Sequence, residues 1–186
     1  MFLLKTQEIP SGHTIDDYVT RRLQAPGHDG QLVPISVIHH KDTKIDGTAP
    51  CLLYGYGAYG MSMPASFNTN NLSLVDRGFV YAIAHIRGGT DKGFAWYDKG
   101  RREHKQNTFK DFISAAEHLI EQQYTARGKL VAHGGSAGGM LMGAIANMAP
   151  ELFASIIGEV PFVDVLNTML DASLPLTPPE FPEWGN

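Results

Sequence analysis

The spacing of hydrophobic residues changes at about residue 49. Before this point, two β-rich stretches at residues 17–23 and 32–40 flank turn-forming residues, a pattern that predicts an antiparallel hairpin at a sheet edge. After it, short continuous apolar runs alternate with helical segments, as in a parallel sheet that is covered on both faces. We therefore expect an α/β fold with a mostly parallel sheet. Its predicted buried strands are residues 51–56, 79–85, 130–133 and 155–160.

Two helices are predicted between these strands. The first has apolar residues spaced to fall on one helical face, namely Phe109, Phe112, Ile113, Ala116, Leu119 and Ile120. Thr108 and Asp111 have the spacing of a capping box, with Asp in place of the usual Glu, so we expect this helix to start there. The second helix should follow Ser136, where one face carries Met140, Leu141, Ala144 and Ile145.

Composition limits the classes of protein that the chain can represent. Its 186 residues are 43% apolar, enough for one domain with a core, and a formal net charge of −4 argues against nucleic acid or a membrane surface as partner. The apolar runs are too short to cross a bilayer, and residues 1–5 are too short for a signal peptide. The only cysteine, Cys51, lies in an apolar run and is expected to be buried. A cytoplasmic location is expected.

The pattern Gly-x-Ser-x-Gly occurs at residues 134–138, between a predicted strand and a predicted helix. This context is typical of a nucleophile elbow, a strained turn in which side chains at Gly134 and Gly138 would clash. Ser136 would be the nucleophile, and the N–H of Ala137 would be one oxyanion-hole donor. The alternative is a glycine-rich turn for packing or phosphate binding, but no Gly-Lys-Ser/Thr follows, and Ser136 stands where a dinucleotide fingerprint needs its second glycine.

The loop after the first parallel strand, residues 54–60, has three tyrosines among glycines (YGYGAYG). In a hydrolase sheet this loop is placed to give the second oxyanion donor. Glycines let the backbone approach a substrate, while tyrosines offer hydroxyl donors and flat apolar faces. Aromatic packing over the sheet edge is the alternative for each tyrosine by itself.

Several blocks together resemble the prolyl oligopeptidase family of serine peptidases. These blocks are residues 53–60, 77–89 and 134–139. Further blocks resemble the oligopeptidase B (protease II) group of that family, namely residues 107–112, 160–165, 168–171 and 183–186. The resemblance covers nearly the whole chain, and blocks in a fixed order are far more specific than one elbow motif.

The resemblance implies an α/β-hydrolase domain, capped in full-length members by a β-propeller, that cleaves short peptides after Arg or Lys. By position it implies that Ser136 is the nucleophile, that Ala137 and the hydroxyl of Tyr56 are the oxyanion donors, and that Tyr59 lines the S1 pocket. Glu180 matches the acidic S1 residue, where a carboxylate can pair with a guanidinium or ammonium group. Without the resemblance, Glu180 in its Pro-rich loop would be read as a surface charge.

The same resemblance sets limits on the substrate. Residues 63–66 lack the aspartates that hold basic residues at S2 in the family, so a preference for paired basic residues is not implied. Short basic peptides are the expected partners, and we expect no cofactor and no metal ion. The sequence gives no indication of the oligomeric state.

An α/β-hydrolase triad runs Ser, Asp or Glu, then His along the chain, but all eight histidines precede Ser136. Neither Asp164 nor Asp171 matches the family's triad position. The resemblance implies that residues 1–25 are the end of a propeller or hinge and that residues 26–186 are the N-terminal part of a catalytic domain. Because the triad is incomplete, we expect this part to be inactive by itself. An esterase or lipase, or a non-catalytic truncated product, are the alternative interpretations.

Overall fold

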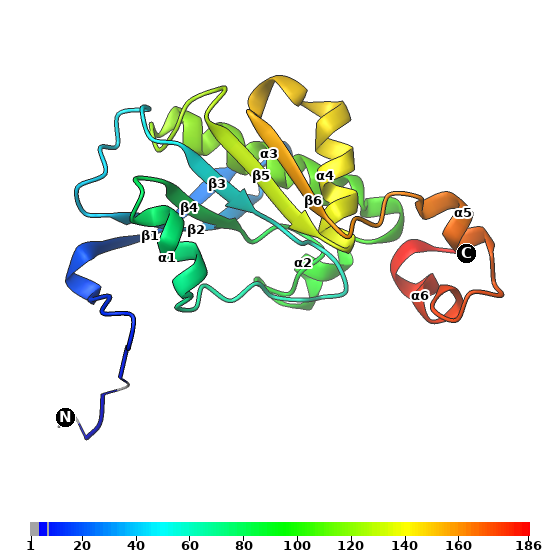
Figure 1. The fold of residues 1–186 in the computed structure, drawn as a ribbon. Coiled ribbons are helices and arrows are strands. Elements are labelled where there is room, and N and C mark those ends of the chain that lie inside the picture. Colours follow the sequence, from blue (N-terminus) through cyan, green and yellow to red (C-terminus); the bar gives the residue numbers. More distant parts are fainter. Residues whose placement is uncertain (1–3, 7) are drawn as a thin grey trace.

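The computed structural model describes residues 4–6 and 8–186, which fold around one mixed β-sheet (Figure 1). The strands lie in the order β1-β2-β4-β3-β5-β6. β1 pairs antiparallel with β2, and β2 with β4, whereas β4, β3, β5 and β6 run parallel. The expected edge hairpin and parallel sheet are thus confirmed. The strands are β1 (Tyr18–Pro26), β2 (Leu32–His40), β3 (Cys51–Tyr54), β4 (Val80–Ala84), β5 (Leu130–Gly135) and β6 (Ser155–Glu159).

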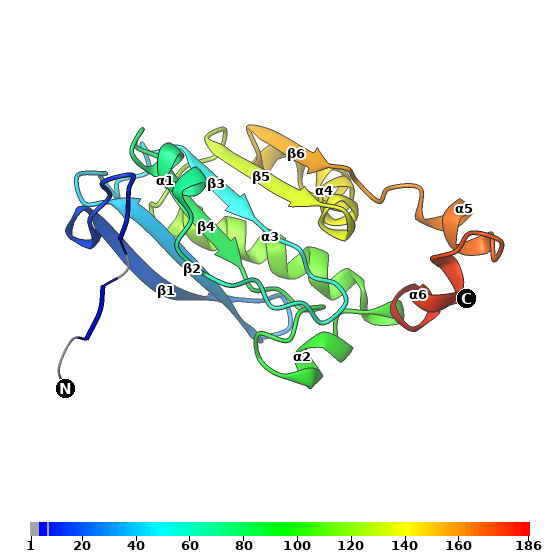
Figure 2. The same ribbon diagram turned by 60° about the horizontal axis from the view of Figure 1, so that its bottom comes forward.

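Helices cover both faces of this sheet. α3 and α4 pack on one face and α1 on the other, while α5 and α6 stand beyond the carboxyl end of β6 (Figures 1 and 2). None of the described helices is both long and apolar enough to cross a membrane. The helices are α1 (Thr69–Val75), α2 (Phe94–Asp98), α3 (Gln106–Glu121), α4 (Ala137–Met148), α5 (Val165–Leu170) and α6 (Thr177–Trp184), with 3-10 turns η1 (Ile15–Asp17), η2 (Arg102–His104) and η3 (Pro150–Leu152).

The core lies between the sheet and helices α3 and α4. Phe112 and Leu119 from α3 meet Leu141 and Ile145 from α4, all of them fully or almost fully buried. Cys51 on β3 is also buried, as predicted, and burial raises the pKa of its thiol. The two predicted helices are present because their apolar stripes face this core.

The predicted start of α3 is wrong. The helix begins at Gln106, and Thr108 does not cap it, because the Thr108 hydroxyl donates to the carbonyl oxygens of Arg87 and Gly100 at 2.8 and 3.1 Å. Asp111 accepts hydrogen bonds from the backbone N–H and the guanidinium of Arg87. Both side chains are completely buried, so the pair joins the helix to a neighbouring loop.

The expected domain boundary near residue 25 falls inside β1, which pairs with β2 along nine residues. The Ala25 side chain is fully buried in the hydrophobic core. The assignment of residues 1–25 to a propeller or hinge stays a prediction, and residues 1–3 and 7 lie outside the described part of the chain.

Candidate active site

Ser136 lies on a strained turn between β5 and α4. Its backbone has φ 55° and ψ −115°, a conformation that a residue with a Cβ rarely adopts. The turn is held on both sides, because the N–H of Ser136 donates to the carbonyl of Glu159 at 2.9 Å, and the carbonyl of Ser136 accepts from Phe162 at 2.9 Å. Ser136 itself is exposed. The predicted elbow conformation is therefore present at the carboxyl end of β5.

The flanking glycines are required by close backbone contacts. A Cβ on Gly134 would overlap the carbonyl of Gly138, and one on Gly138 would lie 2.8 Å from the carbonyl of Gly55. Glycine at these positions lets the turn approach the loop after β3. The predicted clash of side chains at Gly134 and Gly138 is confirmed.

The predicted oxyanion donor Ala137 is the first residue of α4. The N–H groups in the first turn of a helix have no acceptor inside the helix, and the helix dipole places partial positive charge there. The amide of Ala137 follows Ser136 directly and can donate to an oxygen that becomes negatively charged beside the Ser136 hydroxyl.

Tyr56 lies in the loop after β3 and packs against the elbow, since a Cβ on Gly138 would come within 3.4 Å of its Cα and 3.5 Å of its ring. Burial raises the pKa of its phenol, and the nearby Ser136 side chain acts in the opposite direction. The phenol thus stays protonated at neutral pH and remains a hydrogen-bond donor. The strand predicted to reach Tyr56 ends at Tyr54, which leaves Tyr56 in the loop beside the elbow.

Tyr59 and Glu180 lie next to Tyr56. The rings of Tyr56 and Tyr59 have centroids 6.4 Å apart, and the Tyr59 ring meets Trp184 edge-on at 5.5 Å. The indole N–H of Trp184 donates to Glu180 at 3.0 Å and lies 3.3 Å from the Tyr59 hydroxyl. Burial, with the negative charge of Glu180 nearby, raises the pKa of the Tyr59 phenol. The structure thus brings Ser136, Tyr56, Tyr59 and Glu180 into one continuous cluster.

The Pro-rich stretch expected to be a loop forms helix α6 instead. Pro178 and Pro179 occupy its first turn, where the missing N–H groups have no helical partner to lose. Glu180 is half-buried on this helix, three residues before the almost fully buried Glu183. A carboxylate on a helix is held in a more defined direction than one in a loop.

Sequence reasoning missed Glu183 and Lys105. Glu183 accepts a hydrogen bond from the backbone N–H of Tyr59 at 3.1 Å and one from the Tyr97 hydroxyl at 2.7 Å. The Lys105 ammonium donates to the carbonyl of Gly57 and lies 3.9 Å from Glu183. Nothing in the local sequence separates either residue from an ordinary surface charge. Their role is visible only in contacts with residues that lie 124 positions away for Glu183 and 48 positions away for Lys105.

The histidines near the sheet have other partners. His85 is buried and hydrogen-bonds to Asp91 and Ser36, each at 2.8 Å, while His133 lies 3.4 Å from Glu159 and stacks edge-on with Tyr54. Within the described part of the chain, no histidine is hydrogen-bonded to the Ser136 hydroxyl.

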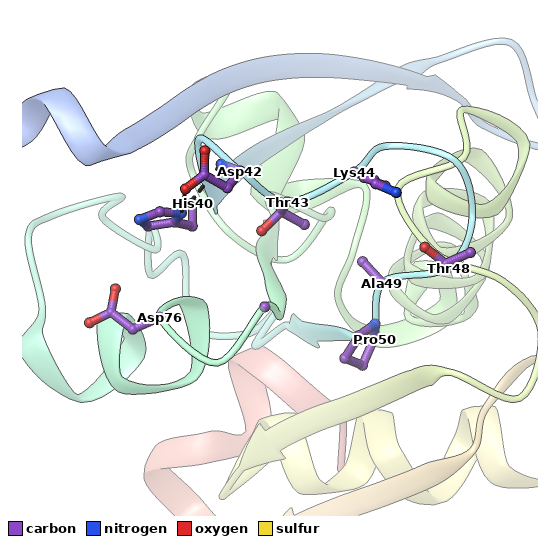
Figure 3. A pocket seen from close by; sticks show the side chains of 9 residues that line it. His40, Asp42, Thr43, Lys44, Thr48, Ala49, Pro50 and Asp76 are labelled. Atoms are coloured by element: carbon purple, nitrogen blue, oxygen red, sulfur yellow. Dashed lines mark hydrogen bonds and ion pairs between the residues drawn. The ribbon is translucent and has the colours of Figure 1, made fainter.

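A separate pocket lies at the opposite end of the sheet. It is lined by His40 at the end of β2, by Pro50 and Gly78, which precede β3 and β4, and by Asp42 and Asp76 (Figure 3). Ser136 follows the carboxyl end of β5, which runs parallel to β3. The pocket therefore faces away from the cluster around Ser136.

Comparison with known proteins agrees with this geometry. Residues 65–186 match the Prolyl oligopeptidase family of S9 peptidases. The chain belongs to this family. It is 52% identical over 184 residues to dipeptidyl aminopeptidase BI of Pseudoxanthomonas mexicana and 49% identical over 165 residues to protease 2 of Moraxella lacunata, covering 98% and 89% of this chain. It is therefore related to serine peptidase hydrolases, close to oligopeptidase B.

Solved structures of family members have the same fold. Oligopeptidase B from Leishmania major superposes with a TM-score of 0.93 at 47% identity, covering 97% of this chain and 25% of that one. Oligopeptidase B from Trypanosoma brucei with covalently bound antipain gives 0.94 at 46%, covering 98% and 26%. The α/β-hydrolase fold is thus confirmed. The chain spans about a quarter of the length of the two relatives named above, 25% and 24%.

Proposed function

We propose that the whole protein is a serine peptidase that cleaves short peptides after Arg or Lys, through an acyl-enzyme on Ser136. The observation that carries this proposal is the cluster in which Tyr56 packs against the strained elbow of Ser136, Tyr59 lies beside Tyr56, and Trp184 links Tyr59 to Glu180. Membership of the S9 family supports the reaction class, and the cluster supports the choice of substrate.

In the proposed reaction the Ser136 oxygen attacks the carbonyl carbon of the scissile peptide bond, and its proton passes to a general base. The carbonyl oxygen becomes negatively charged and accepts hydrogen bonds from the Ala137 N–H and the Tyr56 hydroxyl. Collapse of this intermediate releases the amine with a proton and leaves an ester on Ser136, which water then hydrolyses. The strained backbone presents the hydroxyl in the direction of attack.

Glu180 is proposed to bind the positive charge of the substrate side chain. The Tyr59 ring provides a flat face for the apolar part of an Arg or Lys side chain, and the carboxylate lies where the charged end would reach it. The half-buried position of Glu180 strengthens such a pair relative to one in bulk water.

The test uses the whole protein and three peptide amides that differ only at the residue before the scissile bond, with Arg, Lys or citrulline there. We expect Ser136→Ala to abolish turnover of all three. Glu180→Gln should lower kcat/KM for the Arg and Lys peptides by about 10- to 100-fold, and should leave the citrulline peptide unchanged. Glu117→Gln, an exposed position on α3, is the matched control. Equal loss on charged and neutral peptides would contradict the role of Glu180.

Release of dipeptides from a free N-terminus is a second candidate, favoured by the 52% identity to a relative named dipeptidyl aminopeptidase BI. Two versions of the Arg substrate separate the candidates, one with a free and one with an acetylated N-terminus. An endopeptidase cleaves both, whereas a dipeptidyl aminopeptidase requires the free amine two residues before the scissile bond.

We further propose that the 186-residue chain by itself has no appreciable peptidase activity. A serine without its general base loses most of its rate, and no histidine follows Ser136 in the sequence. Turnover of the Arg peptide by the purified chain, abolished in Ser136→Ala, would overturn this proposal.

A further inference from the structure

Two segments far apart in the sequence are joined behind the predicted S1 residues. The loop that carries Tyr56 and Tyr59 meets helix α6, which carries Glu180, through the carboxylate of Glu183. This carboxylate is 3% exposed, and its two oxygens accept hydrogen bonds from the Tyr59 backbone N–H and the Tyr97 hydroxyl. Both oxygens of the buried Glu183 carboxylate thus accept hydrogen bonds, one from the loop and one from Tyr97 of α2.

The Tyr59 backbone is strained at this contact. Tyr59 and Gly60 have φ values of 57° and 67°, and the N–H of Met61 donates to the carbonyl of Ala58 at 3.1 Å. Positive φ at both central residues is the pattern of a type I′ turn, which favours Gly, Asn or Asp at the position that Tyr59 occupies. Such a conformation persists only where neighbouring groups hold it, and Glu183 supplies the acceptor.

Lys105 holds the other side of the same loop. Its ammonium donates to the carbonyl of Gly57, next to Tyr56, and lies over the Trp184 ring at 4.9 Å from the ring centroid. The side chain is 13% exposed and lies 3.9 Å from Glu183. Lys105 and Glu183 therefore contact the loop at Gly57 and Tyr59, on either side of Ala58.

Helix α6 is fixed to the same region by its backbone. Arg101 donates to the carbonyl of Pro182 at 3.2 Å, and Arg102 donates to the carbonyl of Phe181 at 3.3 Å. These bonds anchor the C-terminal half of α6 to the segment of Arg101 and Arg102, and Glu183 anchors the helix to the loop.

We propose that Glu183 and Lys105 are positioning residues. They hold the loop of residues 54–60, the tyrosine loop, and helix α6 in a fixed relative position, so that Tyr59 and Glu180 face the same substrate cation. The inference rests on the proposed role of Glu180 in cation binding. A buried ion pair adds little stability over a well-packed apolar pair, so its effect here lies in the geometry that it fixes.

The first test follows the two tryptophans by NMR in the 15N-labelled 186-residue chain. Trp184 and Trp96 each give one indole N–H signal, and the Trp96 indole donates to the His85 carbonyl in the core, which makes it an internal report on folding. In Glu183→Gln we expect the Trp184 indole and Tyr59 amide signals to move while the Trp96 signal stays. The matched control Glu117→Gln should move none of them. Unchanged Tyr59 and Trp184 signals in folded Glu183→Gln would overturn the proposal.

The second test measures the binding of benzamidine, a small aromatic cation, to the same chain by titration calorimetry. Glu183→Gln keeps the size of the side chain and retains Glu180, and we expect it to raise the Kd about tenfold. Glu117→Gln should not change the Kd. Equal Kd values for wild type and Glu183→Gln would overturn the positioning role but leave the role of Glu180 standing. Absence of benzamidine binding in the wild type would count against Glu180, and the NMR signals would then decide the positioning role.

The wild-type chain provides a further measurement if Glu183→Gln does not fold. Burial lowers the pKa of the Lys105 ammonium to about 8, although Glu183 acts to raise it. As the pH rises through about 8, Lys105 loses its charge and its attraction to Glu183, so the Tyr59 and Trp184 signals should titrate together. A titration that leaves both signals unmoved would overturn the proposal, and the same signals in Lys105→Met should not titrate in this range. Among the charged and titratable groups around Lys105, Glu183 of α6 lies 3.9 Å away, and Arg102 of η2 lines the same pocket. Tyr97 of α2 donates to Glu183, and Glu180 and Tyr59 contact Trp184, over whose ring Lys105 lies.

Discussion

Arg87 is the largest side chain that is completely buried in the described part of the chain. Its guanidinium donates to Asp111 on α3, which is fully buried, and to Asp29 in the turn between β1 and β2, which is 38% exposed. A buried charge is tolerated only when its hydrogen bonds are satisfied, and the fork of Arg87 is shared between two carboxylates. One residue thus ties the edge hairpin to α3.

Asp111→Asn should reduce the free energy of unfolding by about 3–5 kcal/mol, because it leaves the Arg87 charge buried with only its partly exposed partner. Urea unfolding followed by circular dichroism measures this loss. Asp98→Asn, which breaks the exposed pair with Arg101, is the matched control and should cost about 0–1 kcal/mol. Similar losses in the two variants would contradict the importance of burial.

Tyr56→Phe should lower kcat of the whole protein on an Arg peptide by about 100- to 1000-fold, since the proposed mechanism would lose one of its two oxyanion donors. KM should change little, because the donor acts on an oxygen that is charged only in the transition state. Tyr54→Phe, two residues earlier at the end of β3, is the control and should retain the activity. Loss of kcat in both variants would indicate packing rather than oxyanion binding.

Residues of the site differ in how far the sequence could predict them. Ser136 and Ala137 follow from a local pattern, because strand, turn and helix are neighbours in the chain. The roles expected for Tyr56, Tyr59 and Glu180 came from the family resemblance. Glu183 could not be found in this way, since nothing in its sequence neighbourhood shows that it contacts the backbone of Tyr59. The capping box predicted at Thr108 and Asp111 was wrong for the same reason. Their spacing is a local pattern, whereas Arg87, with which both side chains form hydrogen bonds, is distant in the sequence.

At the scale of elements, the tight turn at Ser136 can form because β5, α4 and the loop after β3 pack with almost no side chains between them. Gly134, Gly138 and Gly55 approach one another through their backbones, and Gly139 on α4 packs against Pro161 after β6. Close approach of this kind brings the start of α4 and the tyrosine loop to the same side of Ser136.

Gly138→Ala should therefore destabilise the protein by about 1–3 kcal/mol, because its Cβ would lie 2.8 Å from the carbonyl of Gly55, a backbone atom that cannot rotate away. Thermal unfolding measures the loss. Gly143→Ala in the same helix meets only the side chain of Val163, at 3.3 Å, which is exposed and can move outward, so this variant should be neutral or stabilise by up to about 1 kcal/mol. A stable Gly138→Ala variant would contradict the backbone contact.

Helix α3 was predictable because its apolar stripe repeats over 16 residues, and β4 because its short apolar run is buried in the sheet. The short helix α2 and the helices α5 and α6 were not, because they are only five to eight residues long and few of their side chains are buried. α6 also contains three prolines, which favour a loop on local grounds. Contacts with η2 and with Tyr59 stabilise the helical form.

For the whole molecule, the two edges of the sheet differ in character. The edge strand β1 exposes Thr20, Arg21 and Arg22, charged and polar residues that discourage pairing with another chain. The edge strand β6 exposes Ile157, at 44%, and the segment after it exposes Val160 at 80%. The β6 side therefore offers unpaired backbone groups next to apolar side chains.

Ile157→Lys should reduce self-association of the 186-residue chain, because a lysine on an open edge strand opposes pairing with a second strand. Sedimentation velocity across a range of concentrations measures this, with the free energy of unfolding expected to change by less than about 0.5 kcal/mol. Arg21→Lys on the opposite edge is the control and should not alter association. Undiminished association in Ile157→Lys would locate the contact elsewhere.

Helices α5 and α6 are attached to the body of the protein in an unusual way. α5 buries no residue, and α6 buries only Thr177 and Glu183, so the segment is held by polar bonds and by the contacts of Trp184 with Tyr59 and Phe162 rather than by a hydrophobic core. Segments of this kind open in small cooperative steps that cost far less than global unfolding. The amides of α6 should accordingly exchange with deuterium long before those of β5. Because Glu180 belongs to α6, each such opening moves its carboxylate away from the cluster around Ser136 and leaves the strained turn at Ser136 intact.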